Sequence, residues 1–176
     1  MPRVAILHPD LGIGGAERLI VDISLALKSH EYQVDLYTNF HDPQRCFDET
    51  RNGQLKVVVA CSWLPRTIFG RFYALCAYLR FISLALYVVL IEGRKTHYDL
   101  FLCDQISAAI PILHLTNRPV IFYCHYPDQL LTQRNSLLKK VYRWPIDQFE
   151  VSATTIGFLI VFGRFRFGRR VWLIEF

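Results

Sequence analysis

Residues 3–24 read "RVAILHPDLGIGGAERLIVDIS", and the glycines in this stretch mark a change of hydrophobic period. Residues 3–8 form a short apolar run, which is typical of a buried parallel strand that Pro9 and Gly12 end. From Gly15 onward, apolar residues recur at helical spacing, and charged residues occupy the other faces. The stretch therefore predicts a strand, a glycine turn and an amphipathic helix.

Further apolar runs predict strands along the chain, at 32–38, 56–61, 99–104 and 119–125. The connections between them are mostly small or helical, and such alternation favours an α/β fold with a parallel sheet flanked by helices. Ligands of these sheets bind beyond the carboxyl ends of the strands. Polar residues follow three of the predicted ends: His8, Asp104 with Gln105, and His125 with Tyr126 and Asp128.

Length and charge limit the classes of protein to consider. With 176 residues, 52% of them hydrophobic, the chain is long enough for one domain with a core and too short for two ordinary ones. The net charge is +5, but residues 151–176 hold four arginines and one glutamate and so carry +3 of it. Basic residues are therefore not gathered in the predicted folded part, which argues against a nucleic-acid binder.

Residues 72–91, "FYALCAYLRFISLALYVVLI", are apolar over about the length of a membrane-crossing helix. Arg80 stands in the middle, and a central arginine costs ~2.5–3.5 kcal/mol on membrane insertion. Three interpretations stay open: a long core helix, a helix that lies in or dips into a membrane, and a full span.

The glycine loop is suited to a phosphate, because backbone N–H groups at a helix start lack intrahelical partners and glycine lets an anion approach them. A dinucleotide is disfavoured: Glu17 stands at the third glycine position of the usual fingerprint, and Asp35 lies in the middle of its strand rather than at the end. A tight turn that merely needs glycine remains the alternative.

Four motifs carry a resemblance to a known family: "LHPDLGIGGAERLIVD", "CDQISAAIP", "IFYCHYPDQLLT" and "LLKKVYRWPID". Over roughly residues 3–150 the chain resembles the N-terminal half of glycosyltransferases of family 4. Within that family it is most similar to mannosyltransferases of the asparagine-linked (dolichol) glycosylation pathway. The motif "GGAER" alone indicates only the wider family 4. The motif "CHYPD" followed by "LLT" indicates the mannosyltransferases within that family.

This resemblance implies a retaining enzyme of the GT-B fold, in which two Rossmann-like domains face a cleft. Such an enzyme transfers mannose from GDP-mannose to a dolichol-diphosphate-linked oligosaccharide, in alpha-1,3 and alpha-1,6 linkages. The resemblance implies the cytoplasmic face of the endoplasmic reticulum membrane as the location. It implies no cofactor and no metal, because GT-B enzymes generally do not depend on one.

The resemblance also assigns roles to residues. Gly12, Gly14 and Gly15 would approach the donor diphosphate across the cleft, and His125 would lie near the transferred sugar as the catalytic residue. Three further residues are candidates to bind substrate: Glu17, Tyr126 and Asp128. Glu17 is equally well explained as an acidic residue that favours the first turn of a helix.

Residues 151–176, "VSATTIGFLIVFGRFRFGRRVWLIEF", depart from the family pattern. The sequence thus predicts a Rossmann-like, acceptor-side domain over 1–150, an aberrant basic and aromatic tail, and no donor-binding domain. No Glu-x7-Glu motif, which relatives carry in that second domain, occurs in the chain. We expect this chain to be inactive alone, and a non-catalytic module that binds a membrane or a protein is the alternative.

Overall fold

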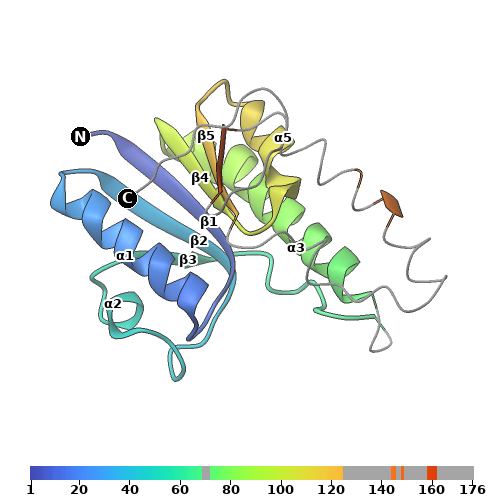
Figure 1. The fold of residues 1–176 in the computed structure, drawn as a ribbon. Coiled ribbons are helices and arrows are strands. Elements are labelled where there is room, and N and C mark those ends of the chain that lie inside the picture. Colours follow the sequence, from blue (N-terminus) through green and yellow to red (C-terminus); the bar gives the residue numbers. More distant parts are fainter. Residues whose placement is uncertain (69–71, 125–143, 146–147, 149–157, 162–176) are drawn as a thin grey trace.

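Six parallel strands form one sheet in the computed structural model, which describes residues 1–68, 72–124, 144–145, 148 and 158–161 (Figure 1). The order across the sheet is β3-β2-β1-β4-β5-β6. The strands are β1 (Arg3–Leu11), β2 (Gln33–His41), β3 (Lys56–Val59), β4 (Leu100–Asp104), β5 (Val120–Cys124) and β6 (Phe158–Val161). The five strands predicted from the sequence are confirmed, and β6 comes from the segment 151–176 that departs from the family pattern.

Helices cover both faces of the sheet (Figure 1). On one face lies α1 (Gly15–Ser29), and the short α2 (Asp48–Arg51) lies between β2 and β3 in the chain. The other face carries α3 and the elements that pack with it or follow it: α3 (Tyr73–Tyr87), the π-helical turn η1 (Val88–Glu92), α4 (Gly93–Lys95), the 3-10 turn η2 (Ser107–Ala109) and α5 (Ile110–His114).

The central strand β1 is buried on both faces, as a parallel strand between two layers of helices must be. Val4 and Ile6 belong to the apolar cluster beneath α1, whereas Ala5 and Leu7 belong to the larger cluster beneath α3. All four side chains are fully buried. The continuous apolar run of the sequence thus supplies both halves of the core.

Strand β1 is longer than predicted, because Pro9 does not end it. His8 pairs with Thr38 of β2, and Asp10 pairs with Phe40, so the ladder continues past the proline. The pairing of β1 with β4, by contrast, stops at Leu7. Beyond that point β1 has a partner on one side only, and a proline that donates no hydrogen bond is tolerated at such an edge.

Helix α3 packs against the sheet, and an ion pair neutralises the charge of Arg80 within this apolar segment. The guanidinium is buried and pairs with Asp10 at the end of β1, with Nη2–Oδ1 and Nη1–Oδ2 distances of 2.9 and 3.4 Å. Asp10 also pairs with Arg66, at 3.3 Å. The inner face of α3 therefore packs on the sheet, as the core-helix interpretation of residues 72–91 expects.

The outer face of α3 and η1 nevertheless carries exposed apolar side chains, namely Tyr73, Leu79, Leu86, Leu90 and Ile91. By length and composition, the continuous helical segment Tyr73–Lys95 would also be able to cross a membrane, although the core helix of a soluble protein passes the same test. Membrane contact of this segment stays a prediction.

A buried chain of hydrogen bonds joins β2 to the start of β4 on the α3 side of the sheet. The Tyr98 hydroxyl lies 2.5 Å from the Tyr37 hydroxyl and donates to Asp35 Oδ2 at 2.7 Å, and Lys56 pairs with Asp35 Oδ1 at 2.9 Å. Burial, more than any other cause, raises the pKa of both tyrosines well above the usual range.

We expect Asp10→Asn to lower the free energy of unfolding of the 176-residue chain by about 1–3 kcal/mol, because it leaves the buried Arg80 guanidinium without its anion. Urea unfolding followed by circular dichroism measures this. Asp22→Asn is the control, since Asp22 only pairs with the exposed Arg18 on the surface of α1. Equal midpoints for the two variants would show that the Asp10–Arg80 pair does not hold α3 to the sheet.

The tyrosine pair predicts a loss of stability at alkaline pH. The folded-state pKa values of the two tyrosines are raised above the unfolded value of about 10. The contribution of the two hydroxyls to the free energy of unfolding is therefore complete below pH 10 and is lost as the pH rises beyond it. Urea unfolding at several pH values between about 8 and 11 should show this decline, and Tyr98→Phe should make it shallower. The exposed Tyr73 supplies the control Tyr73→Phe, which should leave the slope unchanged.

Candidate functional site

The order of the strands creates a topological switch point at the carboxyl edge of the sheet, and we call the region beyond it the crevice. From β1 the chain proceeds outward to β2 and β3, then returns to place β4 on the other side of β1. At this switch point the β1–β4 ladder ends with the pair Leu7 and Cys103, while β1 continues beside β2 as far as Leu11. The two strands part there, and crevices of this kind are where open parallel sheets bind ligands.

The glycine loop connects the end of β1, beyond this switch point, to α1. Gly14 precedes the first turn of α1 in an extended conformation, with φ −166° and ψ 174°, and no side chain caps the helix. Its carbonyl accepts a hydrogen bond from the Arg18 N–H at 2.9 Å. The first N–H groups of α1 thus have no intrahelical acceptor, as at any helix start, and the positive end of the helix dipole lies in the loop.

The fold itself gives no reason for glycine at these positions. Gly12, Gly14 and Gly15 all lie outside the left-handed region that favours glycine, whereas Gly53 lies in it with φ +80°. A Cβ atom placed on Gly12 or Gly15 would meet nothing within 4 Å. A tight turn that needs glycine therefore does not explain Gly12 or Gly15, and the open space beside them is what a ligand needs to approach the backbone.

The carboxylate of Glu17 lies against Gly14. A Cβ atom on Gly14 would stand 2.3 Å from Glu17 Oε2, at the end of a flexible side chain. An acidic group in the first turn stabilises the helix through its dipole, as the sequence allows. Because the negative carboxylate already lies at the loop, it would have to rotate away from an arriving phosphate.

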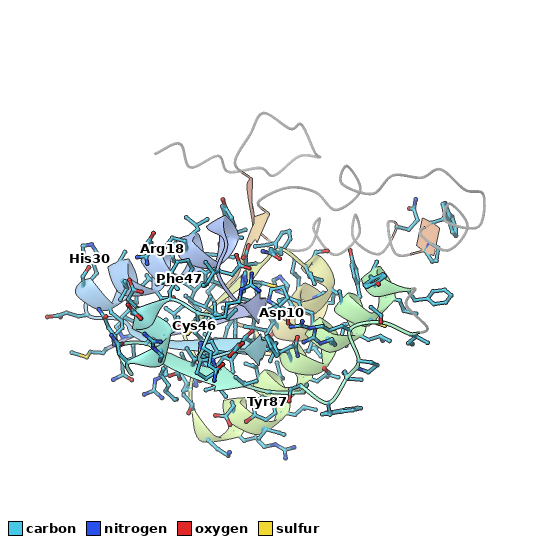
Figure 2. The ribbon with its side chains drawn as sticks, turned by 90° about the horizontal axis from the view of Figure 1, so that it is seen from below. Asp10, Arg18, His30, Cys46, Phe47 and Tyr87 are labelled. Carbon is cyan, nitrogen blue, oxygen red and sulfur yellow. The ribbon has the colours of Figure 1, made fainter. Side chains whose placement is uncertain are left out.

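Arg18, also part of "GGAER", is engaged in contacts within the chain. It pairs with Asp22 and with Glu49, at 2.5 and 2.9 Å, and its guanidinium lies over the Phe47 ring, 5.2 Å from the centroid (Figure 2). The hydrogen bonds to the two carboxylates raise the pKa of Arg18. A backbone hydrogen bond at Glu49 and the bond from Arg18 lower the pKa of Glu49. Arg18 therefore ties α1 to α2.

A histidine and an aspartate meet at the floor of the crevice. His8 Nδ1 lies 2.7 Å from Asp104 Oδ2, and both side chains are only 1% exposed. Asp104 Oδ1 is buried and has no hydrogen-bond partner in the part of the chain that the structure describes. Each residue follows the last pair of the β1–β4 ladder, so the pair bridges the two strands where they begin to part.

The residue after Asp104 has an unusual backbone. Gln105 adopts φ 64°, in the left-handed region that non-glycine residues seldom enter. Its N–H donates to the carbonyl of Tyr123, and the N–H of Ile106 donates to the carbonyl of Asp104 at 2.8 Å. Such conformations cost about 1–3 kcal/mol and gather at functional sites.

The end of β2, where a dinucleotide enzyme carries its ribose-binding acid, is occupied by structural contacts. Asn39 Nδ2 donates to the carbonyls of Ala60 and Arg80, both at 3.1 Å. Thr38 Oγ1 donates to the carbonyl of Pro9 at 3.1 Å. Both residues are buried, which agrees with the exclusion of a dinucleotide site.

The structure brings part of the predicted site together. Four of the predicted residues lie at one junction: Gly12 and Gly14 in the loop before α1, and Gly15 and Glu17 in its first turn. His125, Tyr126 and Asp128 lie outside the described residues. Within the described residues, no group of three His, Cys, Asp or Glu side chains is placed to hold a metal ion.

The pairing of His8 with Asp104 is the feature that the sequence did not reveal. Both residues were expected at strand ends, but 96 positions separate them in the chain. Their meeting depends on β4 lying next to β1, which the order of elements along the chain does not state.

Comparison with solved structures shows the same fold at low sequence identity. The chain is similar to a sucrose-phosphate synthase from Thermosynechococcus elongatus, with a TM-score of 0.62 and 14% identity over 92% of this chain and 42% of that one. A glycosyltransferase of kitacinnamycin matches with a TM-score of 0.53 and 15% identity, over 92% of this chain and 46% of that one. These neighbours are GT-B glycosyltransferases, so the fold class expected from the sequence is confirmed.

Sequence comparison gives closer relatives. An alpha-1,3/1,6-mannosyltransferase of Rhizomucor pusillus is 54% identical over 159 residues, which are 90% of this chain and 34% of the relative. The mouse protein of the same name is 51% identical over 87% of this chain and 37% of its own length. The chain thus spans about a third of the length of the curated relatives it matches.

The family model described as Glycosyltransferase Family 4 matches residues 13–155, which include α1 and the strands β2 to β5. The resemblance inferred from the four motifs is thereby confirmed, and the chain belongs to glycosyltransferase family 4.

Proposed function

We propose that this chain is the acceptor-side part of a mannosyltransferase that transfers mannose from GDP-mannose to a dolichol-diphosphate-linked oligosaccharide, in alpha-1,3 and alpha-1,6 linkages. The glycine loop carries this proposal: it offers backbone N–H groups at a helix start, with open space at Gly12 and Gly15. Support for mannose as the sugar comes from the relatives, which are named mannosyltransferases.

The chemistry of the transfer suits such a loop. The anomeric carbon of mannose loses its bond to a diphosphate oxygen, which keeps the electron pair, and gains a bond to the acceptor oxygen, which releases its proton. Negative charge grows on the diphosphate as that bond breaks. N–H groups and a helix dipole already aimed at this charge stabilise the transition state more than the ground state.

The loop forms one side of the proposed phosphate site. The chain matches about a third of each relative, and in GT-B enzymes the donor also contacts a second domain across the cleft. We therefore expect the remainder of such an enzyme to supply the other contacts to GDP-mannose.

Membrane association belongs to the same proposal, because a dolichol-linked acceptor stays in the bilayer. The exposed apolar face of α3 and η1, with Leu79, Leu86 and Leu90, suits the acyl boundary of a membrane. Arg94 and Lys95 at its end suit anionic headgroups. We propose the cytoplasmic face of the endoplasmic reticulum membrane as its location.

The same apolar face favours a second candidate, a non-catalytic module that binds a membrane or a protein. The two candidates differ in the glycine loop, which a binding module does not use. Substitutions in that loop would leave the membrane binding of such a module unchanged and would abolish transfer by the enzyme.

We expect Gly15→Ala and Gly53→Ala to have opposite effects. Gly15→Ala should leave the free energy of unfolding unchanged or raise it by up to about 1 kcal/mol, because an alanine fits there. It should lower mannose transfer roughly 10- to 100-fold, because its Cβ keeps the diphosphate from the backbone. Gly53→Ala should cost about 1 kcal/mol of stability, because of its positive φ, and leave transfer unchanged.

Both variants require an active enzyme, which a hybrid provides. Residues 1–150 of this chain are joined to the part of the Rhizomucor pusillus relative that follows its counterpart of residue 150, and stability is measured on the 176-residue chain. Equal transfer by the Gly15→Ala hybrid and the unmodified hybrid would contradict a phosphate role for the loop.

The 176-residue chain itself should transfer no mannose, whereas the hybrid should elongate a dolichol-linked acceptor with GDP-mannose. Mass spectrometry of the lipid-linked product measures both reactions. Transfer by the chain alone would show that it holds the whole donor site. A hybrid that is folded, as judged by circular dichroism, and yet inactive would overturn the proposed function in favour of the binding module.

A further inference from the structure

The geometry points to the His8–Asp104 pair as the place where a sugar hydroxyl of the acceptor is held, with His8 in contact with the hydroxyl and Asp104 as the residue that positions His8. This inference rests on the proposed function and adds residues to it for which the family resemblance gave no role. It is carried by the contact between the two residues, their burial and the partnerless oxygen of Asp104.

The contact sets the hydrogen-bonding character of His8. A carboxylate only accepts hydrogen bonds, so at 2.7 Å from Asp104 Oδ2 the Nδ1 atom carries the proton. In the neutral ring, Nε2 is then an acceptor. Asp104 Oδ1 is a second hydrogen-bond acceptor, so each of the two side chains offers one acceptor.

Two hydrogen-bond acceptors on one pair of side chains favour a particular kind of ligand. Phosphate oxygens at neutral pH are acceptors and gain nothing from Nε2 or Oδ1, whereas a sugar hydroxyl donates a hydrogen bond. The glycine loop has the opposite character, because it offers N–H donors. The glycine loop therefore suits the diphosphate, and the His8–Asp104 pair suits the hydroxyl.

The position of the pair agrees with this division. Ile6 and Leu102 belong to the apolar cluster beneath α1, and two residues further along each strand His8 and Asp104 continue the same face. The pair thus lies on the α1 side of the sheet, as the glycine loop does. Gln105, with its strained backbone, follows directly.

Stability alone does not explain the pair. Backbone hydrogen bonds already join β1 to β4 up to Leu7 and Cys103. Replacing both partners of a buried hydrogen bond by apolar groups of the same shape is often neutral or stabilising, and a carboxylate oxygen left without a donor carries a cost. A hydroxyl that donates to Oδ1 or Nε2 removes that cost when the acceptor binds.

Burial of the pair is compatible with a ligand. Reaction sites exclude water, which strengthens the hydrogen bonds inside them, and segments that cover such sites open to admit the substrate. The proposal thus requires that a small mannoside reach His8 in solution, which is directly measurable.

Nuclear magnetic resonance of the 176-residue chain, with nitrogen-15 in its histidines, tests the inference. The His8 signals are identified by their loss in His8→Gln. We expect Nδ1 to be protonated and Nε2 to be bare. We also expect methyl α-D-mannopyranoside to shift the Nε2 signal, whereas sulfate, an anion that carries no proton to donate, does not. A protonated Nε2, or an Nε2 signal that the mannoside leaves in place, would overturn the inference.

Asp104→Asn tests the positioning role, because an amide can donate to Nδ1 and reverse the tautomer of His8. It should shift the proton to Nε2 and weaken mannoside binding roughly tenfold. Asp35→Asn is the matched control, since Asp35 is another buried aspartate of the sheet but lies in the middle of β2. That variant should leave the His8 tautomer and mannoside binding unchanged, whatever its stability.

His8→Gln covers the case in which Asp104→Asn does not fold, and it too should lose mannoside binding. In the hybrid, either substitution should raise the KM for the acceptor or lower kcat, while the KM for GDP-mannose stays the same. Equal changes in both KM values would indicate a structural role and overturn the inference. Mannoside binding at His8 in a chain whose folded hybrid transfers no mannose would instead contradict only the proposed function.

Discussion

Burial of β1 on both faces is the constraint from which the position of the crevice follows. Helix α1 covers one face and α3 the other, so the strand cannot shift relative to either layer without exposing apolar side chains. The carboxyl end of β1 is therefore fixed, and with it the start of the loop that follows. The point where β4 leaves β1 is fixed as well, because β4 pairs with the same buried stretch.

Asp10 connects the α3 layer to this edge. Its carboxylate pairs with Arg80 from the buried face of α3 and with Arg66 from the connection before that helix. Asn39 adds a hydrogen bond from β2 to the Arg80 carbonyl. The charge of Arg80, in the middle of an apolar helix, thus attaches α3 to the sheet. The outer side of the same helix stays apolar. One helix can therefore both complete the core and present a surface to a bilayer.

The sequence was sufficient for the strands β1 to β5, for α1 and for the fold class, because a change of hydrophobic period is a local signal in the sequence. It did not predict β6, which comes from the segment that departs from the family pattern. It placed the end of β1 too early, since Pro9 stops most strands and only the absence of β4 beyond Leu7 makes the proline tolerable. The glycine loop was found from its motif. The His8–Asp104 contact was not, because it joins residues from strands that are neighbours only in the folded sheet.

The two parts of the crevice have opposite hydrogen-bonding character, and this opposition limits what the site can bind. N–H donors at the start of α1 favour an anion, and the acceptors of His8 and Asp104 disfavour one. A ligand that satisfies both carries a phosphate and, a short distance away, a hydroxyl. Neither substrate of a glycosyl transfer needs to supply both groups, because the donor brings the diphosphate and the acceptor brings the hydroxyl. Under the proposed function, the crevice therefore meets a different substrate with each of its two parts, which brings the reacting groups together.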